Sequence, residues 1–98
     1  MPRPCKPKTI RGRPNSNYFK PAGIPLKDLQ ETILNLEEFE TIRLKDFLGL
    51  DQTSCAEKMN TSQPTFHRAL TNARQKIADA IVNGKAIKIT KDKEWTKK

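Results

Sequence analysis

The longest regular pattern of apolar positions lies between residues 62 and 84. Its apolar side chains recur at intervals of four, three, four and four, at Phe66, Leu70, Ala73, Ile77 and Ile81. This spacing places them on one face of a helix. Ser62 offers an N-cap hydroxyl, Pro64 falls in the first turn, and Asn83-Gly84 favours a helix end. The pattern predicts a helix over 63–83.

A second helix is predicted over about 37–47. Asn35 supplies capping chemistry and Glu37-Glu38 place negative charge where a helix N-terminus favours it. Apolar residues follow at near-helical spacing, at Phe39, Ile42, Phe47 and Leu48. Gly49 then ends the helix.

A short helix is predicted between these two. Asp51 can cap it, and it runs to about Met59 with Cys55, Ala56 and Met59 on one face. Asn60 tolerates the left-handed backbone of a tight turn.

The two ends of the chain follow other patterns. Residues 1–25 hold six of the seven prolines, which forbid a continuous helix and indicate an extended arm. Residues 26–36 fit a short helix at first, while a strand remains open toward Leu36. The KAIKIT segment at 85–90 alternates enough for a short strand, and 91–98 read as a basic tail.

These elements define a domain organisation and a fold class. The arm covers 1–25, a helix-turn-helix domain 26–84, and a short strand or basic tail 85–98. We therefore expect an all-α fold, a helix-turn-helix core with an extended basic N-terminal arm, to which a short C-terminal strand can be added.

Charge suggests a polyanionic partner. The formal net charge is +8, and basic ends flank a middle segment, 26–59, that carries eight acidic and four basic residues. Lys and Arg gathered on a phosphate backbone release counterions, which drives non-specific affinity. Cys5 and Cys55 with one histidine cannot assemble a zinc site, so we expect no metal and no cofactor. No apolar run approaches a membrane span, so we expect a cytoplasmic protein without a membrane partner.

The segment from Gln52 to Leu70 has the layout of a helix-turn-helix. Small Ala56 allows two helices to approach, Asn60 turns the chain, and Phe66 returns to the shared core. The outward face of the helix at 63–83 then remains available to enter the major groove of double-stranded DNA.

Three sets of residues are candidates for DNA contacts. Base readout is assigned to side chains near the start of this helix, Gln63, Thr65, His67 and Arg68. Phosphate contacts are assigned to Gln52, Thr53, Ser62, Asn72, Arg74 and Lys76. The arm contains Arg11-Gly12-Arg13, which resembles the core of an AT-hook that lies in a minor groove, although a plain basic tail is the alternative.

Long stretches of the chain resemble a known family. They are the MPRP start, YFKPAGIPL, LEEFETIRLKDFLGLDQ and FHRALTNARQKIADAIVNGKAIKI. Together they are similar to the small prokaryotic predicted DNA-binding proteins catalogued as domain of unknown function 134. Its helix-turn-helix is similar to region four of sigma-70-type factors, which implies an all-helical core and major-groove binding. Gln63-Pro64 departs from the family, where Arg often follows the capping Ser, and puts one expected contact in doubt.

The leading hypothesis is a sequence-specific transcriptional regulator. Because one helix-turn-helix reads few base pairs, a homodimer is expected, paired through KAIKIT or the helix at 37. Two alternatives remain open: a module that docks on RNA polymerase or other transcription machinery, supported by the acidic helix at 37–47, and an architectural DNA binder. One His and no phosphate loop argue against an enzyme and leave no catalytic residue to assign.

Overall fold

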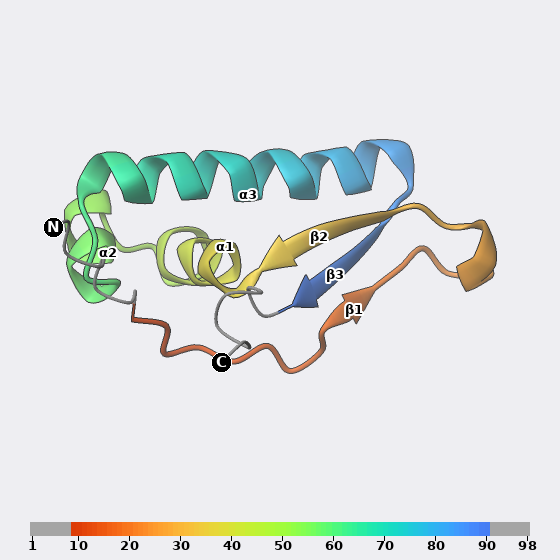
Figure 1. Cartoon of the computed structure of the whole chain (residues 1–98), viewed down its shortest axis with the longest axis horizontal. Helices are drawn as coiled ribbons and strands as arrows, with labels where there is room; N and C mark the ends of the chain where they lie inside the picture. Colours follow the sequence, from red (N-terminus) through yellow and green to blue (C-terminus); the bar gives the residue numbers. More distant parts are fainter. Residues whose placement is uncertain (1–8, 91–98) are drawn as a thin grey trace, which may run out of the picture.

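The computed structural model describes residues 9–90, which form three helices, two further helical segments and three strands. In chain order they are β1 (Tyr18–Phe19), η1 (Leu26–Asp28), β2 (Glu31–Asn35), α1 (Leu36–Thr41), η2 (Ile42–Phe47), α2 (Gln52–Lys58), α3 (Gln63–Asn83) and β3 (Ala86–Thr90). Figure 1 shows α3 running along most of the long axis, with α2 near its start and the sheet beside its second half.

The strands form one mixed sheet, so the expectation of an all-α fold was wrong. Its order is β1-β3-β2, with β3 antiparallel to β1 and parallel to β2. Leu34 pairs with Ile89, and both are buried against the helices. The strand predicted at KAIKIT is confirmed as β3, and the ambiguous segment 26–36 divides into the 3₁₀ turn η1 and strand β2. The fold is therefore mixed, because β3, far along the chain, completes the backbone hydrogen bonds of β1 and β2 from its earlier part.

The helix starts follow from the capping residues. Asn35 Oδ1 accepts from the amide of Glu38 at 2.8 Å while Glu38 Oε1 accepts from the amide of Asn35 at 3.0 Å, a reciprocal capping box. Asp51 caps α2 through the amide of Ser54 at 2.7 Å. Ser62 caps α3, and Gly84 ends it in a left-handed conformation. The predicted bounds of α3 are confirmed.

The helix predicted over 37–47 changes its winding halfway. It is α-helical through Thr41 and then π-helical as η2, where the amide of Leu48 donates to the carbonyl of Arg43. A π-helical turn rotates the following side chains relative to a continuous α-helix. Leu44 is consequently buried, whereas Phe47 is 81% exposed.

Two apolar clusters form the core. The first joins η2, α2 and the start of α3, through Leu44, Cys55, Ala56, Met59, Phe66 and Leu70. The second joins the sheet to the middle of α3, through Leu34, Ala73 and Ile89. The predicted stripe on α3 is confirmed from Phe66 to Ala73, but Ile81 is 74% exposed and Ala80 is buried instead. A helix turns about 100° per residue, which places Ile81 roughly 60° and Ala80 roughly 40° from Phe66.

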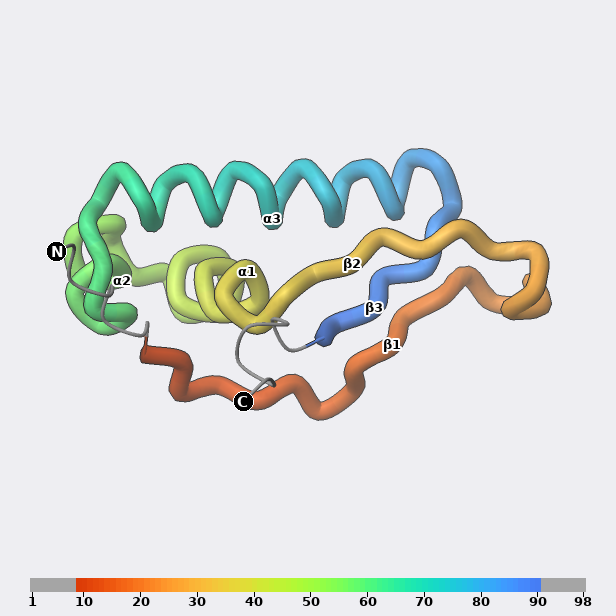
Figure 2. Tube along the Cα trace, in the orientation of Figure 1, coloured from red at the N-terminus to blue at the C-terminus, as the bar shows by residue number. Residues whose placement is uncertain are grey.

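The segment that precedes β1 packs along the body of the protein. Figure 2 shows it running from the α2 end of the molecule, below α1, to the sheet. Its start is fixed by the amide of Thr9, which donates to the carbonyl of Met59 at 3.0 Å. The described part of the predicted arm therefore packs against the helices and contributes β1 to the sheet before it continues to residue 25. Cys5 and the predicted tail at 91–98 lie outside the described residues.

Candidate nucleic-acid interface

The helices α2 and α3 are joined by a tight turn. Asn60 has a φ of 58°, and the amides of Asn60 and Thr61 donate to the carbonyls of Glu57 and Ala56, both at 3.0 Å. Buried Ala56 and Phe66 hold the two helices on one core. Few residues other than Gly adopt this left-handed backbone conformation at a low cost in free energy, and Asn is among them. The turn therefore fixes the direction in which α3 leaves α2.

The base-readout candidates differ in how accessible they are. Gln63, His67 and Arg68 are exposed on the first turns of α3, whereas Thr65 is half-buried. The Thr65 hydroxyl accepts from Ser62 Oγ at 2.9 Å and from Arg68 at 3.5 Å. Gln52 Nε2 lies 3.3 Å from His67 Nδ1 and so links α2 to α3. Gln63, His67 and Arg68 are thus all exposed within the first two turns of α3, while Thr65 contributes to the cap.

Two of the phosphate candidates lie in ion pairs within the protein. Arg74 donates to Asp46 at 2.6 and 3.1 Å, and Lys76 Nζ lies 2.8 Å from Glu38. The hydrogen bond from Arg74 is the main reason that the pKa of Asp46 lies below its ordinary value. These pairs fasten η2 and α1 to α3. Contact with a phosphate would require either cation to exchange its carboxylate partner for the phosphate.

The remaining phosphate candidates lie at the start of α2, at the start of α3 and further along α3. Gln52 is half-buried and follows the Asp51 cap, while Thr53 is exposed in the first turn of α2. Ser62 caps α3, and its Oγ accepts from the amide of Thr65 at 3.2 Å. Asn72 is exposed two turns further along α3. Thr53, Ser62 and Asn72 are therefore the exposed candidates of this set, and of these the Ser62 hydroxyl is engaged in the cap of α3.

A buried carboxylate holds the arm. Glu40 is 1% exposed and accepts four hydrogen bonds: from the amides of Arg11 and Gly12 at 3.1 and 3.2 Å, and from Nε and Nη2 of Arg43, each at 2.8 Å. We call this arrangement the Glu40 clamp. Burial raises the pKa of Glu40, but these hydrogen bonds outweigh it and hold the pKa below its ordinary value. The clamp therefore keeps Glu40 charged inside the protein.

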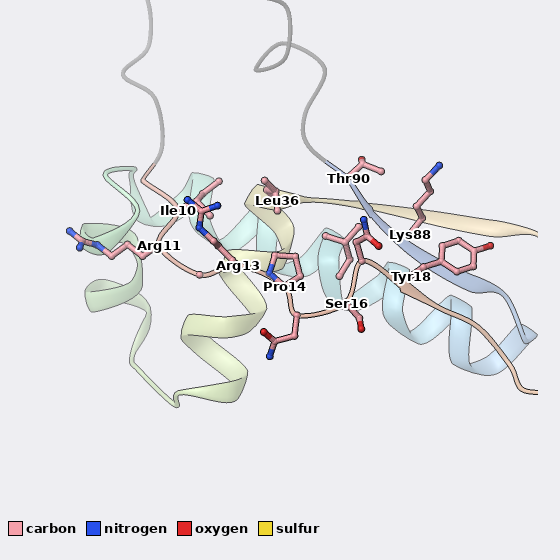
Figure 3. A pocket seen from close by; sticks show the side chains of 13 residues that line it. Ile10, Arg11, Arg13, Pro14, Ser16, Tyr18, Leu36, Lys88 and Thr90 are labelled. Carbon is pink, nitrogen blue, oxygen red and sulfur yellow. The ribbon is translucent and has the colours of Figure 1, made fainter.

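Gly12 is required where the arm crosses the clamp. A Cβ built on Gly12 would lie 2.1 Å from Arg43 Nε. Figure 3 shows the side chain of Arg11 extending toward the α2 end of the molecule, and Arg13 beside Ile10 and Pro14. Both arginine side chains are exposed, and a cavity of about 990 Å³ separates this part of the arm from β3. The backbone of Arg11-Gly12 thus binds the protein while its arginine side chains remain available to a ligand.

Substituting Gly12 should release the arm. In Gly12→Ala the new methyl group must displace Arg43 from Glu40, so we expect trypsin to cut the Arg11–Gly12 bond about tenfold faster, because cleavage follows local opening. Ser16→Ala, at an exposed position of the same segment, is the control. Equal cleavage rates in Gly12→Ala and the native protein would show that the arm is not held by this contact.

Sequence reasoning missed the residues that organise this surface. Glu40 and Arg43 stand three apart on α1 and η2, a spacing typical of helical ion pairs, which was an available signal. Nothing local indicates that the carboxylate also binds a backbone 28 residues away. Within residues 9–90 no group of three or more metal-ligating side chains occurs, and no helix there is long and apolar enough to cross a membrane.

The fold and site define a class: a small α+β protein that presents the first turns of a long helix beside a clamped basic segment. The chain matches the family described as protein of unknown function DUF134 over residues 1–98, and it belongs to that family. A UPF0251 protein of Caldanaerobacter subterraneus is 61% identical over 89 residues, which are 91% of this chain and 75% of that protein. Those of Thermoanaerobacter pseudethanolicus and Pelotomaculum thermopropionicum are 56% and 50% identical, over 91% and 92% of this chain and 75% and 68% of theirs. No solved structure matches.

Proposed function

We propose that this protein binds double-stranded DNA in a sequence-specific manner and regulates transcription. The first turns of α3 enter the major groove, where Gln63, His67 and Arg68 contact base edges. The observation that carries the proposal is the tight α2–α3 turn on a shared core, which leaves these three side chains exposed together. A helix presented in this way fits the width of the major groove.

The arm supplies a second contact in this proposal. Arg11 and Arg13 are exposed on a backbone fixed by Glu40, and Thr9, where the described part of the arm begins, is hydrogen-bonded to Met59 at the end of α2. Arginines on a fixed backbone lose less conformational entropy on entering a narrow minor groove. The Glu40 clamp therefore supports a preorganised arm next to the helix that reads the major groove.

One feature weighs against docking through α1, and another weighs against a homodimer that pairs through KAIKIT. Three of the four acids that made the helix at 37–47 a candidate docking surface are paired within the protein: Glu38 with Lys76, Glu40 with Arg43, and Asp46 with Arg74. Glu38 and Glu40 are also buried. The strand KAIKIT is the central strand of the sheet, so both of its backbone edges are already paired and a second copy cannot join it there. The exposed side chains at the start of α3 therefore favour regulation through DNA binding over docking through α1.

Sequencing of bound genomic fragments tests this proposal. At about 0.15 M salt we expect the native protein to recover fragments that share a motif, and Arg68→Ala to lose that motif, because one bidentate base contact contributes about 1–3 kcal/mol of discrimination. Arg11→Ala with Arg13→Ala should keep the motif and weaken binding. These substitutions are preferable to removing residues 1–20, which would delete β1. Recovery without any motif would contradict sequence-specific binding.

A further inference from the structure

An apolar strip remains uncovered beside α3. The helix α3 covers β2 more fully than it covers the rest of the sheet. On the face of the sheet that α3 covers, two adjoining grooves of about 510 and 310 Å³ are lined mainly by apolar side chains. The first lies between the arm and α1–η2, the second between β1 and the end of α3. Phe19 lines both, so they form one strip that runs past Phe39, Ile42, Phe47, Ile87 and Ile81.

The strip is more exposed than a packed core allows. Phe19 is 52% exposed, Phe47 81% and Ile81 74%. Two exposed phenylalanines on one continuous surface are typical of a protein–protein contact, since each aromatic ring offers a large apolar area to bury. The π-helical turn of η2 contributes directly, because it ends at Phe47.

The charges around the strip select the partner. Four cationic side chains, Arg13, Lys20, Arg43 and Lys85, line the two grooves, and no carboxylate of the described residues lines either of them. Arg43 and Lys85 are already paired with Glu40 and Asp79, whereas Arg13 and Lys20 have no carboxylate partner among the described residues. A second copy turned onto this face would set cations against cations. A segment that carries both apolar and acidic side chains would instead be complementary.

The geometry points to this strip as the docking site for an acidic, apolar peptide segment of another protein. Phe19 and Phe47 bury the apolar side chains of that segment, and Arg13 and Lys20 pair with its carboxylates. Ile81 lies 15 residues beyond Phe66 on α3, which is about 22 Å along the helix. The Ile81 end of the strip is thus far from the first turns of α3. The other end includes Arg13, which the proposed minor-groove contact also uses, but Phe19, Phe47 and Lys20 belong to no proposed DNA contact, so this inference does not depend on DNA binding.

Selection from a phage-displayed library of random 12-residue peptides against the full chain tests the assignment. We expect enrichment of peptides that combine aromatic or large aliphatic residues with Asp or Glu. A synthetic enriched peptide should lose about tenfold in affinity with Phe47→Ser and with Lys20→Glu, as centrally placed contacts do. Val82→Ser is the control, because Val82 is 78% exposed but lines neither groove.

Four outcomes would overturn the assignment. The first is that no peptide is enriched over a surface without protein, and the second is that the enriched peptides lack acidic residues. The third is that Phe47→Ser leaves the affinity for the enriched peptide unchanged. The fourth is that duplex DNA displaces the peptide from the native protein but not from Phe47→Ser. Sedimentation equilibrium tests whether a second copy of the chain occupies the strip instead. A native protein that is a dimer and a Phe47→Ser variant that is a monomer would assign the strip to a second copy. Loss of DNA binding in Arg68→Ala with peptide affinity retained would show that the two surfaces are independent.

Discussion

Phe66→Ala is expected to lower the free energy of unfolding by about 3–5 kcal/mol, a large part of the stability of a domain of this size. Phe66 is 1% exposed and is the residue through which α3 packs on α2 and η2. Its removal leaves a cavity between three elements that are joined by short connections and so have little freedom to close it. The measurement is urea denaturation followed by circular dichroism.

Ile81→Ala is the matched control for this prediction. Sequence spacing places Ile81 on the same apolar stripe, but it is 74% exposed. We therefore expect a change within about 0.5 kcal/mol. Equal losses in Phe66→Ala and Ile81→Ala would mean that α3 is buried along its whole stripe, which would contradict the orientation of its second half.

Glu40→Gln is expected to destabilise the protein by about 3 kcal/mol at neutral pH. The amide cannot accept all four hydrogen bonds that the carboxylate receives, and it leaves the Arg43 charge without its partner. Glu57→Gln, at an exposed position of α2, is the control. Equal stability in Glu40→Gln and the native protein would show that the clamp contributes nothing to folding.

The same substitution should change the dependence of stability on pH. The pKa of Glu40 is lower in the folded protein than its ordinary value of 4.5, so its contribution is fully present above pH 4.5 and is lost as pH falls through the folded pKa. Asp46, Asp51 and Asp79 also have lowered pKa values and act in the same direction. Relative to Glu40→Gln, the native protein should therefore lose up to about 1.4 kcal/mol more per pH unit below 4.5. Parallel curves would contradict a charged Glu40.

The helices were predictable because their signals are local. Asn35, Asp51 and Ser62 each cap a helix through an amide three residues away, and Asn60 turns the chain within its own neighbourhood. Such interactions need no knowledge of the rest of the fold. The π-helical turn at η2 was missed, since the spacing of Phe39, Ile42 and Phe47 fits an α-helix nearly as well.

The sheet was not predictable by the same reasoning. Glu31 pairs with Ala86 and Asn35 with Thr90, so each strand depends on a partner 55 residues away. Five-residue segments carry too little periodicity to distinguish a strand from a helix. The expectation of an all-helical core was wrong because the helices have strong local patterns in the sequence, whereas the short strands have weak ones.

The candidate site was predictable in its residues more than in their roles. The outward positions of Gln63, His67 and Arg68 follow from helical geometry. Arg74 and Lys76 are on the surface as expected, yet each pairs with an acid 28 or 38 residues away. The sequence indicated only that Glu40 lies in an acidic helix. Its burial could not be predicted, because it depends on hydrogen bonds from the amides of the arm and from Arg43.

The most direct test of the proposed function is the ratio of affinities for specific and scrambled DNA. Titrations at about 0.15 M salt would compare a duplex carrying the recovered motif with a duplex of the same composition and shuffled sequence. The account predicts a ratio of about a thousandfold or more in the native protein, reduced by at least about tenfold in Arg68→Ala. A ratio near one, with both affinities falling equally as salt rises, would contradict sequence-specific readout by α3.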